Sequence, residues 1–159
     1  MNITILCVGK LKEEYFRAAA VEYTKRLSGY CTMAVVETPD EKIPERASHA
    51  DEERIKQKET TRLLEKIPRR DFVIVLDSSG KQLESPVFSE LLSRQATNGF
   101  NGFSFVIGGS LGFAPAMLER ANFVLSASKW TFPHQLMRVI LLEQIYRAFK
   151  IERGEVYHK

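Results

Sequence analysis

The segment that most constrains the fold of this chain is a predicted helix near its C-terminus, residues 134–150, which is apolar around most of its circumference. Its apolar residues are Leu136, Met137, Val139, Ile140, Leu141, Leu142, Ile145, Tyr146, Ala148 and Phe149. A helix with so little polar surface must be covered on more than one side. The chain has 159 residues, enough for one domain with its own core, so we expect a second subunit to supply part of the cover.

Runs that favour strands alternate with helical patterns along the whole chain. We predict strands at residues 2–8, 32–38, 72–76, 103–107 and 122–126. We predict helices at residues 11–27, 48–67, 85–97, 115–120 and 134–150. Ser85 is the expected N-cap of the third helix, with Pro86 at its first position. This order predicts an α/β protein with a mostly parallel sheet flanked by helices, in a single domain of residues 1–159.

Three predicted strand ends mark the expected ligand site. In parallel sheets, ligands bind beyond the carboxyl ends of the strands. Here those ends fall at Leu76, Ile107 and Ser126. A polar loop, residues 127–133, then leads from the last strand into the apolar helix, and the basic and aromatic tail is able to fold back over it. We therefore expect a ligand to contact this loop.

Two features near these strand ends allow more than one interpretation. The glycine-rich sequence GGSLG, residues 108–112, is either a tight turn or a place where a ligand approaches the backbone closely at Gly108. It follows the fourth strand, so it does not fit the dinucleotide fingerprint, which belongs to the first. Residues 77–81 are expected to form a turn, in which Asp77 is a turn former or, alternatively, a general base or a group that accepts a hydrogen bond from a ribose. There is no G-x-S-x-G motif to support a hydrolase.

Positive charge is concentrated at the end of the sequence. Residues 129–159 hold six Lys or Arg and three Glu, which equals the net charge of +3 of the whole chain. The sequence ends in Tyr157, His158 and Lys159. An aromatic ring with a cation is suited to stacking on a base and neutralising a phosphate, so RNA is a candidate partner. Alternatively, the excess charge is chance and the tail is a disordered end.

Cysteine usage and the N-terminus indicate the compartment. Cys7 and Cys31 lie in apolar runs without CxxC spacing or a paired His, which indicates free thiols in a reducing compartment and no metal site. The N-terminal segment lacks the basic start and long apolar run of a signal peptide. No stretch approaches membrane-spanning length. We therefore expect a cytoplasmic protein that binds neither membrane nor metal.

Four sequence strings together resemble a known family. They are VLDSSGK, FVIGGSLG, LSASKWTFPHQLMRVILLEQIYRA and the terminal YHK. In this combination the chain closely resembles the RlmH-type methyltransferases of the SPOUT superfamily over essentially its whole length. The resemblance implies a C-terminal trefoil knot, a homodimer and S-adenosylmethionine as cofactor. It also implies methylation of the N3 of a pseudouridine in 23S ribosomal RNA, on the assembled ribosome.

The same resemblance assigns roles to individual residues. It places cofactor contacts at Leu76, Gly108, Ala127, Ser128, Lys129, Trp130, Thr131 and Phe132. His158 is the first candidate for the base that removes the N3 proton, and His134 is the second. Arg153, Tyr157 and Lys159 are expected to contact RNA, and Arg153 or Lys159 is an alternative stabiliser of the anion that forms on the base. Ser110 and Leu111 are expected to tolerate substitution.

Two other classes of function remain as alternatives. One is a ribosome-binding factor without catalytic activity, which would bind no cofactor. The other is a nucleotide-dependent enzyme such as an NAD-linked oxidoreductase, which the misplaced glycine loop and the missing ribose-binding acidic residue disfavour.

Overall fold

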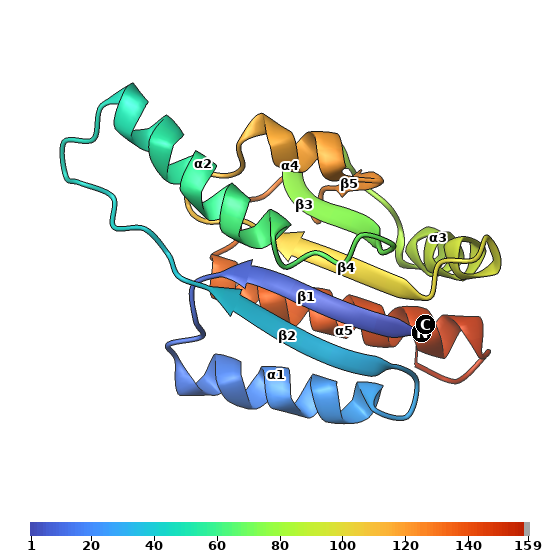
Figure 1. Cartoon of the computed structure of the whole chain (residues 1–159). Helices are drawn as coiled ribbons and strands as arrows, with labels where there is room; N and C mark the ends of the chain where they lie inside the picture. Colours follow the sequence, from blue (N-terminus) through green and yellow to red (C-terminus); the bar gives the residue numbers. More distant parts are fainter. Residues whose placement is uncertain (158–159) are drawn as a thin grey trace.

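The computed structural model describes residues 1–157 and alternates strands with helices along the chain (Figure 1). The strands are β1 (Asn2–Val8), β2 (Thr32–Thr38), β3 (Phe72–Lys81), β4 (Gly102–Ile107) and β5 (Phe123–Leu125). The helices are α1 (Glu14–Leu27), α2 (His49–Leu64), α3 (Ser85–Thr97), α4 (Pro115–Arg120) and α5 (His134–Glu152). His158 and Lys159, both predicted to act in the site, lie outside the described residues.

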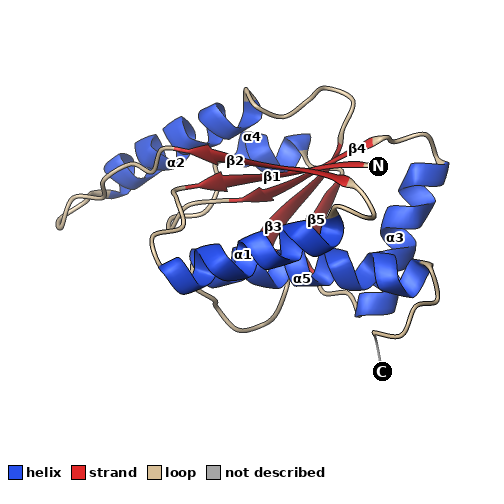
Figure 2. Ribbon diagram, turned by 90° about the horizontal axis from the view of Figure 1, so that it is seen from below, coloured by secondary structure: helices blue, strands red, loops and turns tan. Residues whose placement is uncertain are grey.

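All neighbouring strands pair in parallel, in the order β2-β1-β4-β3-β5, which confirms the predicted fold class. Figure 2 shows α1, α3 and α5 on one face of the sheet and α2 and α4 on the other. The connections that step toward the β2 edge carry α1 and α3, and those that step back carry α2 and α4. Crossovers between parallel strands share one handedness, so connections that run in opposite directions along the sheet must lie on opposite faces of it. The trefoil knot stays a prediction.

Side chains along the central strands point alternately to the two faces of the sheet, so each face has its own hydrophobic core. On β1, Ile3 and Ile5 belong to the core under α1, α3 and α5, whereas Leu6 and Val8 belong to the core under α2 and α4. Strands covered on both faces are expected to be apolar throughout. Because the strands are parallel, the carboxyl ends of all five lie along the same edge of the sheet.

Helix α5 obtains much of its cover from its own chain. It packs on the sheet and against both α1 and α3, and no residue in the range 135–151 is fully exposed. Leu136, Val139 and Ile140 are only half-buried. Two neighbouring helices of the same chain therefore supply part of the cover, and the contribution of a second subunit stays a prediction. No helix within residues 1–157 is long and apolar enough to span a membrane.

Two local predictions were wrong in detail. Ser85 is not the N-cap of α3, because Glu84 takes that position and the Ser85 hydroxyl instead donates to Gln144 Oε1 of α5 at 2.8 Å. The predicted turn at residues 77–81 is a bulged extension of β3. Leu125 pairs with both Leu76 and Lys81, so the residues between them loop out and return to the same partner.

Gly80 allows this return. A Cβ atom placed on it would lie 2.7 Å from the main-chain carbonyl carbons of both Val124 and Leu125. Only a residue without a side chain lets the two strands approach so closely. The bulge therefore clamps β5 at the position where the polar loop begins.

We expect Gly80→Ala to lower the free energy of unfolding by about 1–3 kcal/mol, because the backbone must move to admit the methyl group. Urea unfolding followed by circular dichroism measures the change. Gly29→Ala is the control, since a Cβ atom there meets nothing within 4 Å. Equal stability of the two variants would contradict the close approach.

Candidate active site

A cavity of about 300 Å³, which we call the strand-end cavity, opens beyond the carboxyl ends of β3, β4 and β5. All the residues predicted to bind the cofactor line it, namely Leu76, Gly108, Ala127, Ser128, Lys129, Trp130, Thr131 and Phe132. The strand order explains why they meet, because β4 and β5 both flank β3. Their cofactor contacts stay a prediction.

The loop from β5 to α5 presents its main chain to this cavity. Ser126 Oγ donates to the Ser128 carbonyl and Trp130 N donates to Ser128 Oγ, both at 3.0 Å, which fixes the first half of the loop. Within residues 1–157 no hydrogen bond is formed by the main-chain groups of Ala127, Lys129, Thr131 and Phe132. Since backbone polar groups require partners, these are available to a ligand. The Trp130 side chain is 79% exposed, so its ring does not close the cavity.

Asp77 also lines the strand-end cavity, but its side chain is used locally. Its Oδ1 accepts hydrogen bonds from Ser79 N at 2.9 Å and Ser79 Oγ at 2.6 Å. This is the arrangement of an Asx turn, and it favours the interpretation of Asp77 as a turn former.

His134 is the first residue of α5 and lines the same cavity. Partial desolvation lowers the pKa of its imidazole below the ordinary value of 6.5, and a hydrogen bond with the backbone of Gly108 opposes that effect. A neutral imidazole can accept a proton at neutral pH. The second candidate base therefore lies in the cavity in the protonation state that its role requires.

The described part of the tail packs along α5. Tyr157 donates its hydroxyl to Glu143 Oε1 at 3.1 Å, and its ring packs edge-on against Tyr146. The guanidinium of Arg153 lies 4.4 Å from the ring centroid of Tyr30. Arg153 and Tyr157, the two described residues of the three predicted to bind RNA, thus have contacts inside the fold, and the interaction with RNA stays a prediction.

Three of the six cations in residues 129–159 form ion pairs within the same chain. Ion pairs join Arg138 to Glu37, Arg147 to Glu143, and Lys150 to Glu155. Positive charge is thus concentrated in this segment of the sequence, but half of its cations face carboxylates in the fold.

A second cavity of about 330 Å³ lies beside the first, at the carboxyl ends of β1 and β4. We call it the switch-point cavity, because the connections after β1 and β4 leave in opposite directions along the sheet. Ile107, Gly109, Ser110 and His134 line both cavities. This site was not predicted from the sequence, although one signal was present, an arginine between the apolar residues of the first half of α5.

That arginine, Arg138, is 4% exposed and fixes the floor of the switch-point cavity. It donates from NH1 to Glu37 Oε1 at 2.5 Å and from NH2 to the Gly9 carbonyl at 3.0 Å. Its Nε makes no hydrogen bond within residues 1–157. One turn earlier, Gln135 Oε1 accepts a hydrogen bond from Lys12 N at 2.7 Å, so α5 holds the connection after β1 in place.

The free cysteines are unsuited to nucleophilic chemistry. Burial raises the pKa of both Cys7 and Cys31 to about 11, so both are thiols at neutral pH. Within residues 1–157 no group of three or more His, Cys, Asp and Glu could hold a metal ion.

Residues 1–158 of the sequence match the family described as "Predicted SPOUT methyltransferase". The chain belongs to the SPOUT methyltransferase family. This SPOUT chain is 55% identical over 159 residues to the Ribosomal RNA large subunit methyltransferase H of Clostridium novyi (strain NT), with both proteins covered completely. It is 50% identical over 159 residues to the protein of the same name from Streptococcus equi subsp. equi (strain 4047), again with complete coverage.

The fold of this SPOUT chain also resembles a solved structure, that of a probable methylase family protein from Haemophilus influenzae Rd KW20. The TM-score is 0.55 at 12% identity, and the match covers 99% of this chain and 70% of the other. At this identity the likeness supports the fold alone.

We expect Glu37→Gln to destabilise the protein because it leaves the buried Arg138 without a counter-charge. The Glu37 side chain is 30% exposed, so water offsets part of the cost and the loss is about 1–3 kcal/mol, below the 3–5 kcal/mol typical of fully buried pairs. Chemical unfolding measures it. Glu22→Gln, in the exposed pair with Arg26, should change stability by less than about 0.5 kcal/mol and serves as control.

If His134 is the base, methyl transfer should depend on pH in a defined way. The rate should rise as the imidazole loses its proton, and reach its plateau by about pH 7, because the pKa of His134 lies below 6.5. His134→Gln should abolish this rise and lower the rate by about 10²- to 10⁴-fold. Single-turnover rates between pH 5 and 8 test both, and an unchanged profile in the variant would assign the base elsewhere.

Proposed function

We propose that this chain uses S-adenosylmethionine to methylate the N3 of a pseudouridine in 23S ribosomal RNA. The observation that carries the proposal is the strand-end cavity, which is lined by every residue expected to contact the cofactor. The names of the full-length relatives support the substrate, since both are large-subunit ribosomal RNA methyltransferases.

The cofactor fits the donors and acceptors that the cavity presents. The unpaired main-chain groups of Ala127, Lys129, Thr131 and Phe132 match the ring nitrogens and amino group of an adenine, whereas the loop side chains are chemically mixed. Gly108 and Leu76 complete the walls from the two neighbouring strands. Bound S-adenosylmethionine supplies a methyl group already activated by the positive sulfonium. The chain's contribution is to hold that methyl group in line with the target nitrogen.

The N3 proton must leave during the reaction. His134 is in the cavity and accepts this proton in our proposal, while His158, the first candidate from the sequence, lies outside the described residues. Arg153 packs on Tyr30 at the opposite end of α5, which disfavours it as the stabiliser of the anion on the base of the same chain.

We further propose a homodimer that acts on the assembled ribosome. The half-buried Leu136, Val139 and Ile140 on α5 favour a partner against this face, and a hollow of about 300 Å³ with a mixed polar and apolar lining lies beside them between α3 and α5. Tyr157 contacts Glu143, nine residues and therefore about 13 Å along α5 from His134. The tail thus packs away from the cavity of its own chain. This favours placement of the target base by the other subunit or by the ribosome.

The test is to incubate the protein with ribosomes lacking the modification and with S-adenosylmethionine carrying a labelled methyl group. We expect label on the N3 of one pseudouridine of 23S RNA, mapped by mass spectrometry, and little label on naked RNA fragments. Cofactor binding by calorimetry without label would show that the substrate is wrong. Absence of both binding and label would favour the ribosome-binding factor instead.

A further inference from the structure

The switch-point cavity has the position of a substrate site. In open α/β sheets the crevice lies where the connections from adjacent strands diverge. Here the chain leaves β1 toward β2 and leaves β4 toward β5, so the crevice falls between β1 and β4. Gly109, Ser110 and His134 separate it from the strand-end cavity. A molecule in this crevice would therefore lie next to the proposed cofactor.

Glu59 supplies an unpaired acceptor inside this cavity. Its side chain comes from α2, the residue is 4% exposed, and its Oε1 accepts a hydrogen bond from Glu41 N at 2.9 Å. Its Oε2 has no hydrogen bond within the described part of the chain. Because Glu59 lines the cavity, this oxygen is placed to accept a hydrogen bond from the N–H of a ligand.

Gly109 brings the glycine-rich loop against this oxygen. A Cβ atom at Gly109 would lie 2.3 Å from Glu59 Oε2, so only glycine permits the contact. Burial raises the pKa of Glu59, and the charges of Asp40 and Glu41 add to the effect, while the hydrogen bond from Glu41 N and the charge of Arg62 oppose it. Desolvation and the neighbouring carboxylates thus outweigh the stabilisation that the Glu41 backbone and Arg62 give to the charged form.

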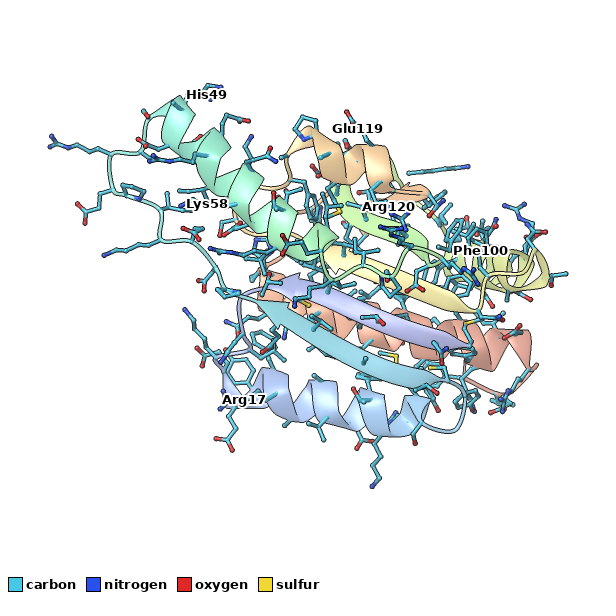
Figure 3. All side chains as sticks on the ribbon, in the orientation of Figure 1. Arg17, His49, Lys58, Phe100, Glu119 and Arg120 are labelled. Atoms are coloured by element: carbon cyan, nitrogen blue, oxygen red, sulfur yellow. The ribbon has the colours of Figure 1, made fainter. Side chains whose placement is uncertain are left out.

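The rim of the switch-point cavity carries three lysines that, within the described chain, are not paired with carboxylates, unlike the paired cations of α5 described above. Lys10, Lys12 and Lys42 line it, are exposed, and form no ion pair in residues 1–157. Of the acidic residues at the same rim, Glu41 is paired with Arg62 and with Lys58, which projects from α2 (Figure 3). Asp40 forms no ion pair within residues 1–157, so the three lysines outnumber the one unpaired acidic residue of the rim. Unpaired lysines around a crevice attract phosphate groups.

We propose that the switch-point cavity receives the target nucleobase, with a ring N–H bonded to Glu59 Oε2 and the flanking phosphates at Lys10, Lys12 and Lys42. The proposal rests on the RNA methyltransferase function above and adds the subsite for the base. A nucleotide from an RNA loop is already partly unstacked, so it enters such a pocket at modest cost. His134 borders both cavities and lies where the methyl donor and the base meet.

Glu59→Gln is the sharpest test, because the amide keeps nearly the same shape. Its carbonyl retains the bond from Glu41 N, and its NH₂ group replaces Oε2, so a donor then faces the ring N–H. We expect kcat/KM with ribosomes lacking the modification to fall by about 10- to 100-fold, while the calorimetric affinity for S-adenosylmethionine is retained. Glu65→Gln, at the exposed end of α2, is the matched control.

A second experiment tests the rim without touching the core. Replacing Lys10, Lys12 and Lys42 together with Gln should weaken ribosome binding and reduce the slope of log K against log salt by about 2–3. Lys25→Gln, an exposed lysine in the last turn of α1, should leave the slope unchanged.

The outcomes separate this inference from the proposed function. If the wild-type protein methylates ribosomes and Glu59→Gln is equally active, the base subsite is refuted while the function stands. Equal losses of cofactor affinity and activity would also refute it, since the cavity would then hold part of the cofactor. An unchanged salt slope in the lysine variant would refute the phosphate contacts. Wild-type protein that labels no ribosome would refute the function itself.

Discussion

The structure of the site depends on one buried positive charge. Arg138 is the only cation among the residues classed as buried within the described chain, and burial of a guanidinium is tolerated only where it is paired and hydrogen-bonded. Its partners, Glu37 and the Gly9 carbonyl, lie at the ends of β2 and β1. Helix α5 is therefore held against the carboxyl edge of the sheet at a fixed position, and His134, one turn earlier, is held between the two cavities.

Both cavities follow from strand order rather than from any single motif. The order β2-β1-β4-β3-β5 places the end of β4 between those of β1 and β3. The glycine-rich loop after β4 is consequently shared, with Gly108 lining one cavity and Gly109 and Ser110 lining both. Ser110 and Leu111, which we expected to tolerate substitution, lie in the wall of the switch-point cavity. One short loop thus separates the proposed sites of the donor and the acceptor.

The sequence predicted the helices and strands well, because the spacing of apolar residues along the chain reflects which side chains are buried. The strands at residues 2–8 and 32–38 and the helix at residues 115–120 have the predicted bounds. It failed at Ser85, where a hydrogen bond to Gln144 replaced the local preference for a cap. At residues 77–81 the Asx turn of Asp77 is present, but the sequence did not show that the chain returns there to pair with Leu125. It also missed Glu59, because a carboxylate in a highly charged helix resembles a solvated residue until the fold buries it. Arg138 was missed although its place in an apolar helix was a signal, because its partners Glu37 and Gly9 are far away in the sequence. The expected cofactor residues came from the family resemblance, not from periodicity.

The double pairing of Leu125 with Leu76 and Lys81 has a consequence for the cost of binding. A strand end clamped from both sides of a bulge is already ordered before any ligand arrives, so it loses little conformational entropy on binding. The main-chain groups just beyond the clamp are the ones without partners in the described chain. The entropy lost on binding is therefore confined to a few loop residues next to a rigid support. A molecule of this size can in this way bind a flexible cofactor without reorganising its core.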